Sequence, residues 1–136
     1  MFREIGTELQ GLVNTLNYLG LLELTRGNLV EARDYLNKGI VSAKKGNLQL
    51  FFRFLFDSLA YHASGRDPRR AAQLFGAAEK LRKHLGIQLF PVERDEYEKY
   101  FTLAHSQLDT ASWSAAWKKG FAMTLEQALE LALSDG

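Results

Sequence analysis

Histidines are the side chains of this chain best suited to metal binding and proton transfer, and the sequence holds three: His62, His84 and His105. A metal site needs such side chains to converge with carboxylates on one point. These three fall on three different predicted helices, and no two of them are four residues apart. The absence of cysteine excludes thiolate catalysis and zinc sites built on Cys. We interpret the histidines as surface or helix-edge residues and expect no metal.

A carboxylate cluster, Asp95, Glu96 and Glu98, is a second candidate for chemistry. Paired carboxylates catalyse proton transfer when a cleft holds them apart. These lie in the first turns of a predicted helix beside Arg94 and Lys99, where helix capping and solvation explain them. The sequence also lacks a G-x4-G-K-[ST] phosphate-binding loop. We therefore predict that the chain is not an enzyme and holds no cofactor.

Basic residues are concentrated between positions 66 and 83. They are Arg66, Arg69, Arg70, Lys80, Arg82 and Lys83. A phosphate-binding stripe is one interpretation. However, Asp67 and Glu79 interrupt the stretch, and the basic residues spread around the helix, which favours a solvated face. Since the formal net charge is only +1, we expect no direct nucleic-acid partner and no acidic membrane surface.

An aromatic run at 51–56 is the best candidate for a binding surface. At about 100° per residue, one helix face carries core residues, and the nearly opposite face carries Leu50, Phe54 and Tyr61. One interpretation is that both faces are buried, since the first helix of a repeat pair packs on two sides. The other is that the second face lines a concave groove for a peptide or helix. The candidate groove residues are Leu50, Arg53, Phe54, Asp57 and Tyr61.

The elements that would position these residues are all helical. Apolar residues recur at helical spacing, and glycine-containing turns separate the segments. Predicted caps are Asp67 before Pro68, an Asn28–Glu31 capping box and a Thr124–Gln127 capping box. The predicted helices span 9–25, 29–45, 48–64, 68–85, 92–108, 110–119 and 125–134.

Neither a signal segment nor an apolar run of ~18 residues occurs, so we predict a cytoplasmic protein without a membrane partner.

One pattern occurs twice. The first copy is Leu16-x2-Leu19-Gly20, then Gly27-Asn28, then Ala32-x3-Leu36, and the second ends in Ala71-x3-Phe75-x2-Ala78. A repeated helix–turn–helix unit is typical of solenoids, which are usually binding scaffolds. We predict a single all-α domain over 1–136, a right-handed stack of helical hairpins. Its parts are a remnant of a preceding repeat (1–6), two repeats (7–46 and 47–86) and three C-terminal capping helices (87–136).

We infer the remnant of a preceding repeat from Ile5-Gly6-Thr7. This triplet stands before the first repeat as Lys45-Gly46-Asn47 stands before the second. The alternative is an ordinary flexible N-terminus. If earlier repeats are missing, the helix at 9–25 is open on one side, and its only charged residue is Glu23. Because exposed apolar patches mark interfaces, we expect a homodimer through this helix.

The first hairpin resembles a tetratricopeptide repeat (TPR). Leu19, Gly20 and Ala32 stand at that family's characteristic positions, with Leu16 and Leu36 in place of its Trp and Phe. The period is longer than the family's, and the terminal Pro is missing.

The C-terminal half is similar to the last repeat and tail of large bacterial signalling proteins, among them LuxR-type and AfsR-like transcriptional regulators and predicted multidomain ATPases. The similar segments are 71–82, 91–98, 116–120 and 124–128. The resemblance implies a non-catalytic protein–protein interaction or sensor scaffold, with catalytic and DNA-binding modules elsewhere in the polypeptide. Its partners would be a protein or peptide and those other modules. The alternative is a receptor domain that binds a small ligand or peptide in the concave groove.

Overall fold

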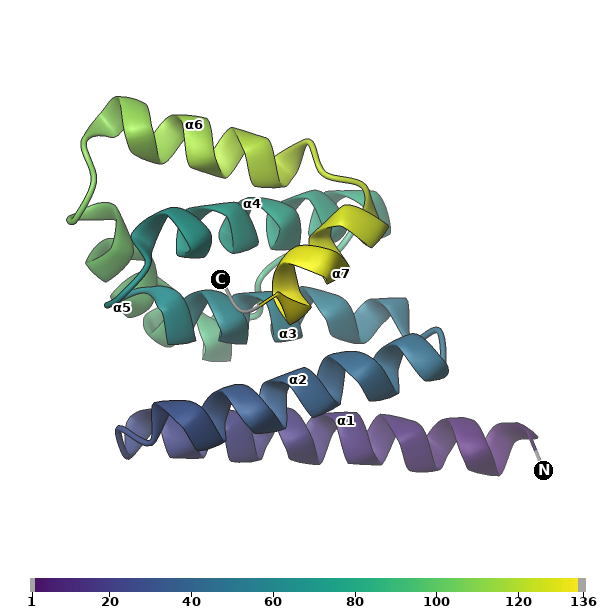
Figure 1. Cartoon of the computed structure of the whole chain (residues 1–136). Helices are drawn as coiled ribbons and strands as arrows, with labels where there is room; N and C mark the ends of the chain where they lie inside the picture. Colours follow the sequence, from purple (N-terminus) through teal and green to yellow (C-terminus); the bar gives the residue numbers. More distant parts are fainter. Residues whose placement is uncertain (1, 135–136) are drawn as a thin grey trace.

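The computed structural model describes the backbone of residues 2–134 and the side chains from Thr7 to Ser134. Within this range the chain forms seven α-helices and no strand, which confirms the all-α prediction. They are α1 (Phe2–Thr25), α2 (Leu29–Lys45), α3 (Gln49–Ala63), α4 (Pro68–Leu85), α5 (Pro91–His105), α6 (Thr110–Phe121) and α7 (Leu125–Leu133). Neighbouring helices pack in pairs, α1 with α2 and α3 with α4 (Figure 1). None of these helices is long and apolar enough to cross a membrane.

Most predicted helix boundaries agree with the structure. Those of α2 and α4 are confirmed, and those of α3, α6 and α7 differ by one or two residues. The predicted end of α5 at 108 is wrong, since the helix ends at His105. Ser106 Oγ and Gln107 Nε2 each donate to the carbonyl oxygen of Leu103 at 2.8 Å, and these side chains occupy an acceptor that a longer helix would use.

The start of α1 is the largest correction. The sequence predicted a helix from residue 9 and a turn at Gly6, but one helix runs without interruption from Phe2 through Gly6 and Gly11. A glycine within a helix costs only about 1 kcal/mol relative to alanine, and the residues around these two glycines sustain the helix. No turn separates residues 2–6 from the first hairpin, so the predicted repeat origin of segment 1–6 stays a prediction.

The turn before α2 differs from its predicted geometry, whereas the cap of α4 is confirmed. Asp67 accepts a hydrogen bond from the backbone N–H of Arg70 at 3.2 Å. Asn28 makes no cap hydrogen bond, so the predicted Asn28–Glu31 capping box is wrong. Its side-chain amide donates to Glu23 at 2.7 Å instead, because that carboxylate lies across the same turn.

Helix α6 lies along α4 with the two backbones in direct contact (Figure 1). Gly76 of α4 faces the carbonyl oxygen of Trp117, and Gly120 of α6 faces the carbonyl oxygen of Gln73. A Cβ atom on either glycine would overlap the partner's backbone. The two glycines therefore permit α6, one of the three predicted C-terminal capping helices, to lie close against α4.

An aromatic cluster centred on Phe75 joins four helices. The ring of Phe75 is fully buried. Its centroid lies 6.0 Å from the ring centroid of Tyr61, 5.2 Å from that of Tyr97, 5.3 Å from that of Phe101 and 6.4 Å from that of Trp113. These rings come from α3, α5 and α6. Aromatic pairs at such distances add to the stabilisation from buried area. The cluster makes α4 the central element of the fold.

Arg70, a buried residue of α4, binds the C-terminal end of α7. Its Nη2 donates to the carbonyl oxygens of Leu131 at 2.8 Å and Ala132 at 3.2 Å. Arg33 of α2 donates to the carbonyl oxygen of Ser134. Positive charge at a helix C-terminus is stabilising. The predicted solvated face is therefore wrong for Arg70, whose charge serves the packing of α7.

The α4–α6 contact gives a test of the fold. We expect Gly76→Ala to lower the free energy of unfolding by about 3 kcal/mol, because the new Cβ must push two backbones apart. Gly11→Ala is the matched control, since nothing lies within 4 Å of a Cβ at this helical position. It should raise stability by about 0.5–1 kcal/mol. Urea denaturation measures both, and equal effects of the two variants would contradict the close contact.

Candidate functional site

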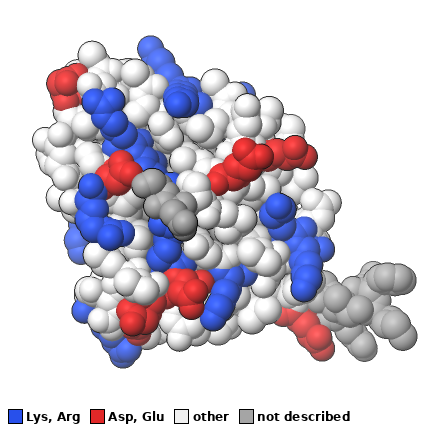
Figure 2. All heavy atoms as spheres, viewed as in Figure 1, with Lys and Arg blue, Asp and Glu red and all other residues white. Residues whose placement is uncertain are grey.

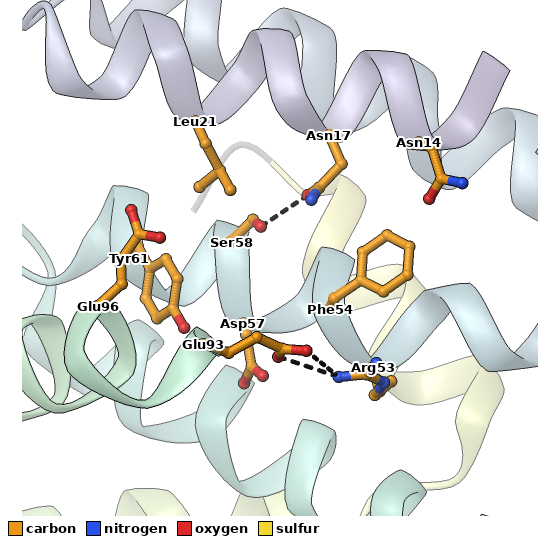
Figure 3. Close-up of a pocket in the computed structure, with 10 residues that line it drawn as sticks. All are labelled: Asn14, Asn17, Leu21, Arg53, Phe54, Asp57, Ser58, Tyr61, Glu93 and Glu96. Carbon is orange, nitrogen blue, oxygen red and sulfur yellow. Dashed lines mark hydrogen bonds and ion pairs between the residues drawn. The ribbon is translucent and has the colours of Figure 1, made fainter. Parts of the chain in front are cut away.

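A pocket lies where α1, α3 and α5 meet, and we call it the α1–α3–α5 pocket. Its volume is about 290 Å³. Asn14, Asn17 and Leu21 line it from α1, Arg53, Phe54, Asp57, Ser58 and Tyr61 from α3, and Glu93 and Glu96 from α5 (Figure 3). The side chains from α1 point toward α3 (Figure 3). The pocket is therefore formed by alternate helices along the chain, α1, α3 and α5.

Four of the five predicted groove residues line this pocket: Arg53, Phe54, Asp57 and Tyr61. Leu50 does not, and its side chain is 58% exposed one turn earlier on α3. Of the four, Phe54 is half-buried, whereas the other three are buried. The structure thus brings the predicted residues of one helix together but places most of them below the surface.

The residues that the sequence missed come from α1 and α5. Asn14 and Asn17 are amides one turn apart in a segment whose only charged residue between 9 and 25 is Glu23, and this pairing was a signal in the sequence. Glu96 belongs to the carboxylate cluster for which the sequence predicts a capping and solvated role. Asp95 and Glu98, the other members of that cluster, are exposed and lie outside the pocket lining.

Arg53 and Glu93 connect α3 to α5 at the edge of the pocket. Arg53 Nη1 lies 3.1 Å from Glu93 Oε1 and 3.0 Å from Oε2. The guanidinium carbon of Arg53 also lies 4.8 Å from the ring centroid of Phe90 and 5.5 Å from that of Phe54. These contacts hold the guanidinium in place, so the charge of Arg53 is already neutralised by Glu93.

Asp57 forms a buried ion pair with Arg82 of α4. Asp57 Oδ2 accepts from Arg82 Nη1 at 2.6 Å, and the two side chains are 3% and 2% exposed. The ring of Tyr97 covers Arg82, with its centroid 5.6 Å from the guanidinium carbon. The predicted solvated face is therefore wrong for Arg82 as well as for Arg70.

The second carboxylate oxygen of Asp57 has no hydrogen-bond partner among residues 7–134. Burial raises the pKa of Asp57 to about 7, and the attraction of Arg82 offsets only part of this effect. An unpartnered buried acceptor costs about 1–3 kcal/mol. Asp57, a residue of the pocket lining, therefore keeps one buried oxygen without a donor in the described part of the chain.

Two more contacts shape the pocket walls. Ser58 Oγ donates to Asn17 Oδ1 at 2.7 Å and so joins α3 to α1. Tyr61 stacks on Tyr100 with the ring centroids 4.8 Å apart, and burial raises the pKa of its hydroxyl. Tyr61 is thus part of both the aromatic core and the pocket wall.

The histidines lie away from this pocket. His84 is exposed, as predicted, but His62 is buried and its Nε2 lies 2.8 Å from the carbonyl oxygen of Leu29. Burial lowers the pKa of His62. His105 is half-buried and packs on the ring of Trp113 at 4.8 Å. No group of three or more His, Asp or Glu side chains suited to a metal ion occurs in the described part of the chain.

Surface charge is mixed in sign. On the face shown in Figure 2, Lys and Arg alternate with Asp and Glu, and no continuous field of one sign covers it. A surface of mixed charge does not attract a polyanion over a long distance.

Comparisons of the chain with protein-family models, with curated proteins and with solved structures found no match. The TPR resemblance and its functional implications therefore stay predictions.

The buried carboxyl gives a pH test. We expect the Asp57 carboxyl carbon to titrate with a midpoint near 7 in ¹³C NMR, against about 3.9 for an ordinary aspartate. The folded protein then holds a proton that the unfolded chain has lost. The stabilisation from this group is complete below pH ~4 and falls by at most about 1.4 kcal/mol per pH unit up to about 7. A midpoint below 5 would contradict the buried, half-satisfied carboxyl.

Proposed function

We propose that the chain is a TPR-like, right-handed helical-hairpin solenoid with a three-helix C-terminal cap. In this proposal it is a non-catalytic protein–protein interaction or sensor scaffold. The support from packing is that α3 contacts both α1 and α5, so the first helices of the two pairs adjoin and α5 continues the same row. Solenoid repeats contact their neighbours in this manner and bind partners on the surface so formed.

Contacts between the motif residues give further support. A Cβ atom at Gly20 would lie 2.7 Å from the side chain of Leu36 and 3.3 Å from the carbonyl oxygen of Ala32. Three positions of the repeated pattern thus meet at the α1–α2 contact. Leu16 is also buried, as a packing motif requires.

The observation that carries the proposal is the α1–α3–α5 pocket on the face that the first helices share. Next to it, Phe54 is half-buried and Leu50, one turn earlier on α3, is exposed. Apolar side chains thus extend from the pocket along α3. A pocket continued by apolar side chains suits a peptide or helix that inserts one side chain and packs along the helix.

The proposed context is the C-terminal part of a larger bacterial signalling or transcriptional regulator. It rests on the resemblance of segments 71–82 and 124–128 to the tails of such proteins. The partner is then another module of the same polypeptide or a separate protein. Self-association through α1 is a further part of the proposal, because Leu12 and Tyr18 are 45% and 65% exposed on this helix.

A small-ligand or peptide receptor is the second candidate. The observation that favours it is the unpartnered Oδ1 of Asp57 in the wall of a 290 Å³ pocket. Ligand pockets of this kind combine apolar walls with a few polar groups that fix orientation.

Peptide binding tests the proposal. We expect peptides selected from a random library on the 136-residue chain to bind Phe54→Ala at least tenfold more weakly, since Phe54 lines the pocket and is only half-buried. Val41→Ala is the control, because Val41 is exposed on α2, away from the pocket lining. Phe54 is preferable to Tyr61, whose truncation would remove core packing worth about 3–5 kcal/mol.

Calorimetry of the selected peptides with both variants provides the measurement, and melting temperatures verify that each variant is folded. Peptides that lose affinity for Val41→Ala but keep it for Phe54→Ala would place the binding face elsewhere. Failure to select any peptide would also count against the proposal.

A further inference from the structure

We propose that the α1–α3–α5 pocket binds a basic side chain, an ammonium or guanidinium group carried by a peptide partner. This inference rests on the proposed function and adds the chemistry that the pocket selects. It follows from the charges of the lining, from a buried acceptor without a donor, and from the size of the cavity.

The lining holds more negative than positive charge. It contains the carboxylates of Asp57, Glu93 and Glu96 and a single guanidinium, that of Arg53. Above pH about 7, where Asp57 is ionised, Glu93 neutralises Arg53, and Arg82, which lies outside the lining, neutralises Asp57. The negative charge of Glu96 has no counter-charge in the lining, so the pocket as a whole favours a cation.

Glu96 is available to a ligand. It is exposed and forms no ion pair with any residue between 7 and 134. Lys99, one turn later on α5, lies over the ring of Tyr100 instead, with its Nζ 5.0 Å from the ring centroid. An unpaired carboxylate at the edge of a pocket attracts cations and repels anions.

Asp57 contributes the second observation. Its side chain is 3% exposed and lines the pocket, and its Oδ1 lacks a donor within the described part of the chain. When Asp57 is ionised, a ligand whose head group reaches this buried oxygen and donates a hydrogen bond removes the penalty of an unsatisfied acceptor. Ammonium and guanidinium groups carry donors and no acceptors, so they match such a site. A carboxylate or phosphate would add a fourth negative group to the three carboxylates without supplying a donor.

The remaining walls suit the alkyl stem of a basic side chain. Leu21, Phe54 and Tyr61 provide apolar and aromatic surface, and the amides of Asn14 and Asn17 provide polar groups at the α1 side. Long basic side chains bury their methylene stems along apolar surface, and their charged heads interact with aromatic faces. A volume of about 290 Å³ lies near the lower end of ligand pockets, and it suits one side chain better than a whole helix.

Titration at pH 8, where Asp57 is ionised, with a matched pair of probes tests the inference. The probes are N-acetyl-arginine amide and N-acetyl-citrulline amide, which differ in that a neutral ureido group replaces the guanidinium. We expect saturable ¹H–¹⁵N NMR shifts at the Asn14 and Asn17 side-chain amides with the arginine probe. The citrulline probe should bind at least tenfold more weakly. N-acetyl-lysine amide should bind at the same residues, since it carries the same charge and only donors.

A matched pair of variants assigns the charge effect. Glu96→Gln should weaken binding of the arginine probe three- to tenfold, with the melting temperature unchanged because Glu96 is exposed and unpaired. Glu126→Gln, an exposed glutamate in the first turn of α7, should leave the affinity unchanged.

Three results would overturn the inference. Equal binding of the arginine and citrulline probes would show that charge is not selected. Free arginine or agmatine binding at least tenfold more tightly than the capped probe would identify a small ligand as the source. Library peptides without enrichment in Lys or Arg that still depend on Phe54 would leave the scaffold proposal standing and remove only this inference.

Discussion

The buried ion pair between Asp57 and Arg82 is the constraint on which the candidate site depends. Two charges leave water only where geometry and covering side chains compensate their desolvation. Here the cover comes from three helices: the pair joins α3 to α4, and Tyr97 of α5 lies over the guanidinium. Because the single 2.6 Å contact uses one carboxylate oxygen, the other stays unsatisfied at the pocket wall. The same interaction thus joins α3 to α4 beneath Tyr97 of α5 and leaves one buried oxygen of the pocket lining without a donor.

The rest of the fold is arranged around α4. Its Phe75 ring gathers aromatic side chains from α3, α5 and α6, and its Gly76 lets α6 approach to backbone contact. On the other side of α3, the α1–α2 pair is attached through helix packing and the Asn17–Ser58 hydrogen bond. The α1–α3–α5 pocket forms where these two assemblies meet, with one wall from the N-terminal pair and the others from α3 and α5.

Local patterns predicted the helices well because their causes are local. The start of α4 at Asp67–Pro68 and the Thr124–Gln127 capping box of α7 each depend on residues at most three positions apart, and both are present. Four pocket residues were predicted because they share one helix. The buried state of Arg70 and Arg82 was missed, since their partners lie far along the chain, 61 residues for Leu131 and 25 for Asp57. For the same reason, the contributions of α1 and α5 to the pocket required the tertiary structure.

A double-mutant cycle on the Asp57–Arg82 pair tests this account most directly. The free energy of unfolding is measured by urea denaturation for the unmodified protein, Asp57→Leu, Arg82→Met and the double variant. Asp57→Leu leaves the Arg82 guanidinium buried without its partner and should lose about 3–5 kcal/mol. Arg82→Met should lose less, because the Asp57 carboxyl can take up a proton, and the double variant should lose far less than the sum. Small, additive losses in the two single variants would contradict the account, because they would show that the pair does not hold α3, α4 and α5 together.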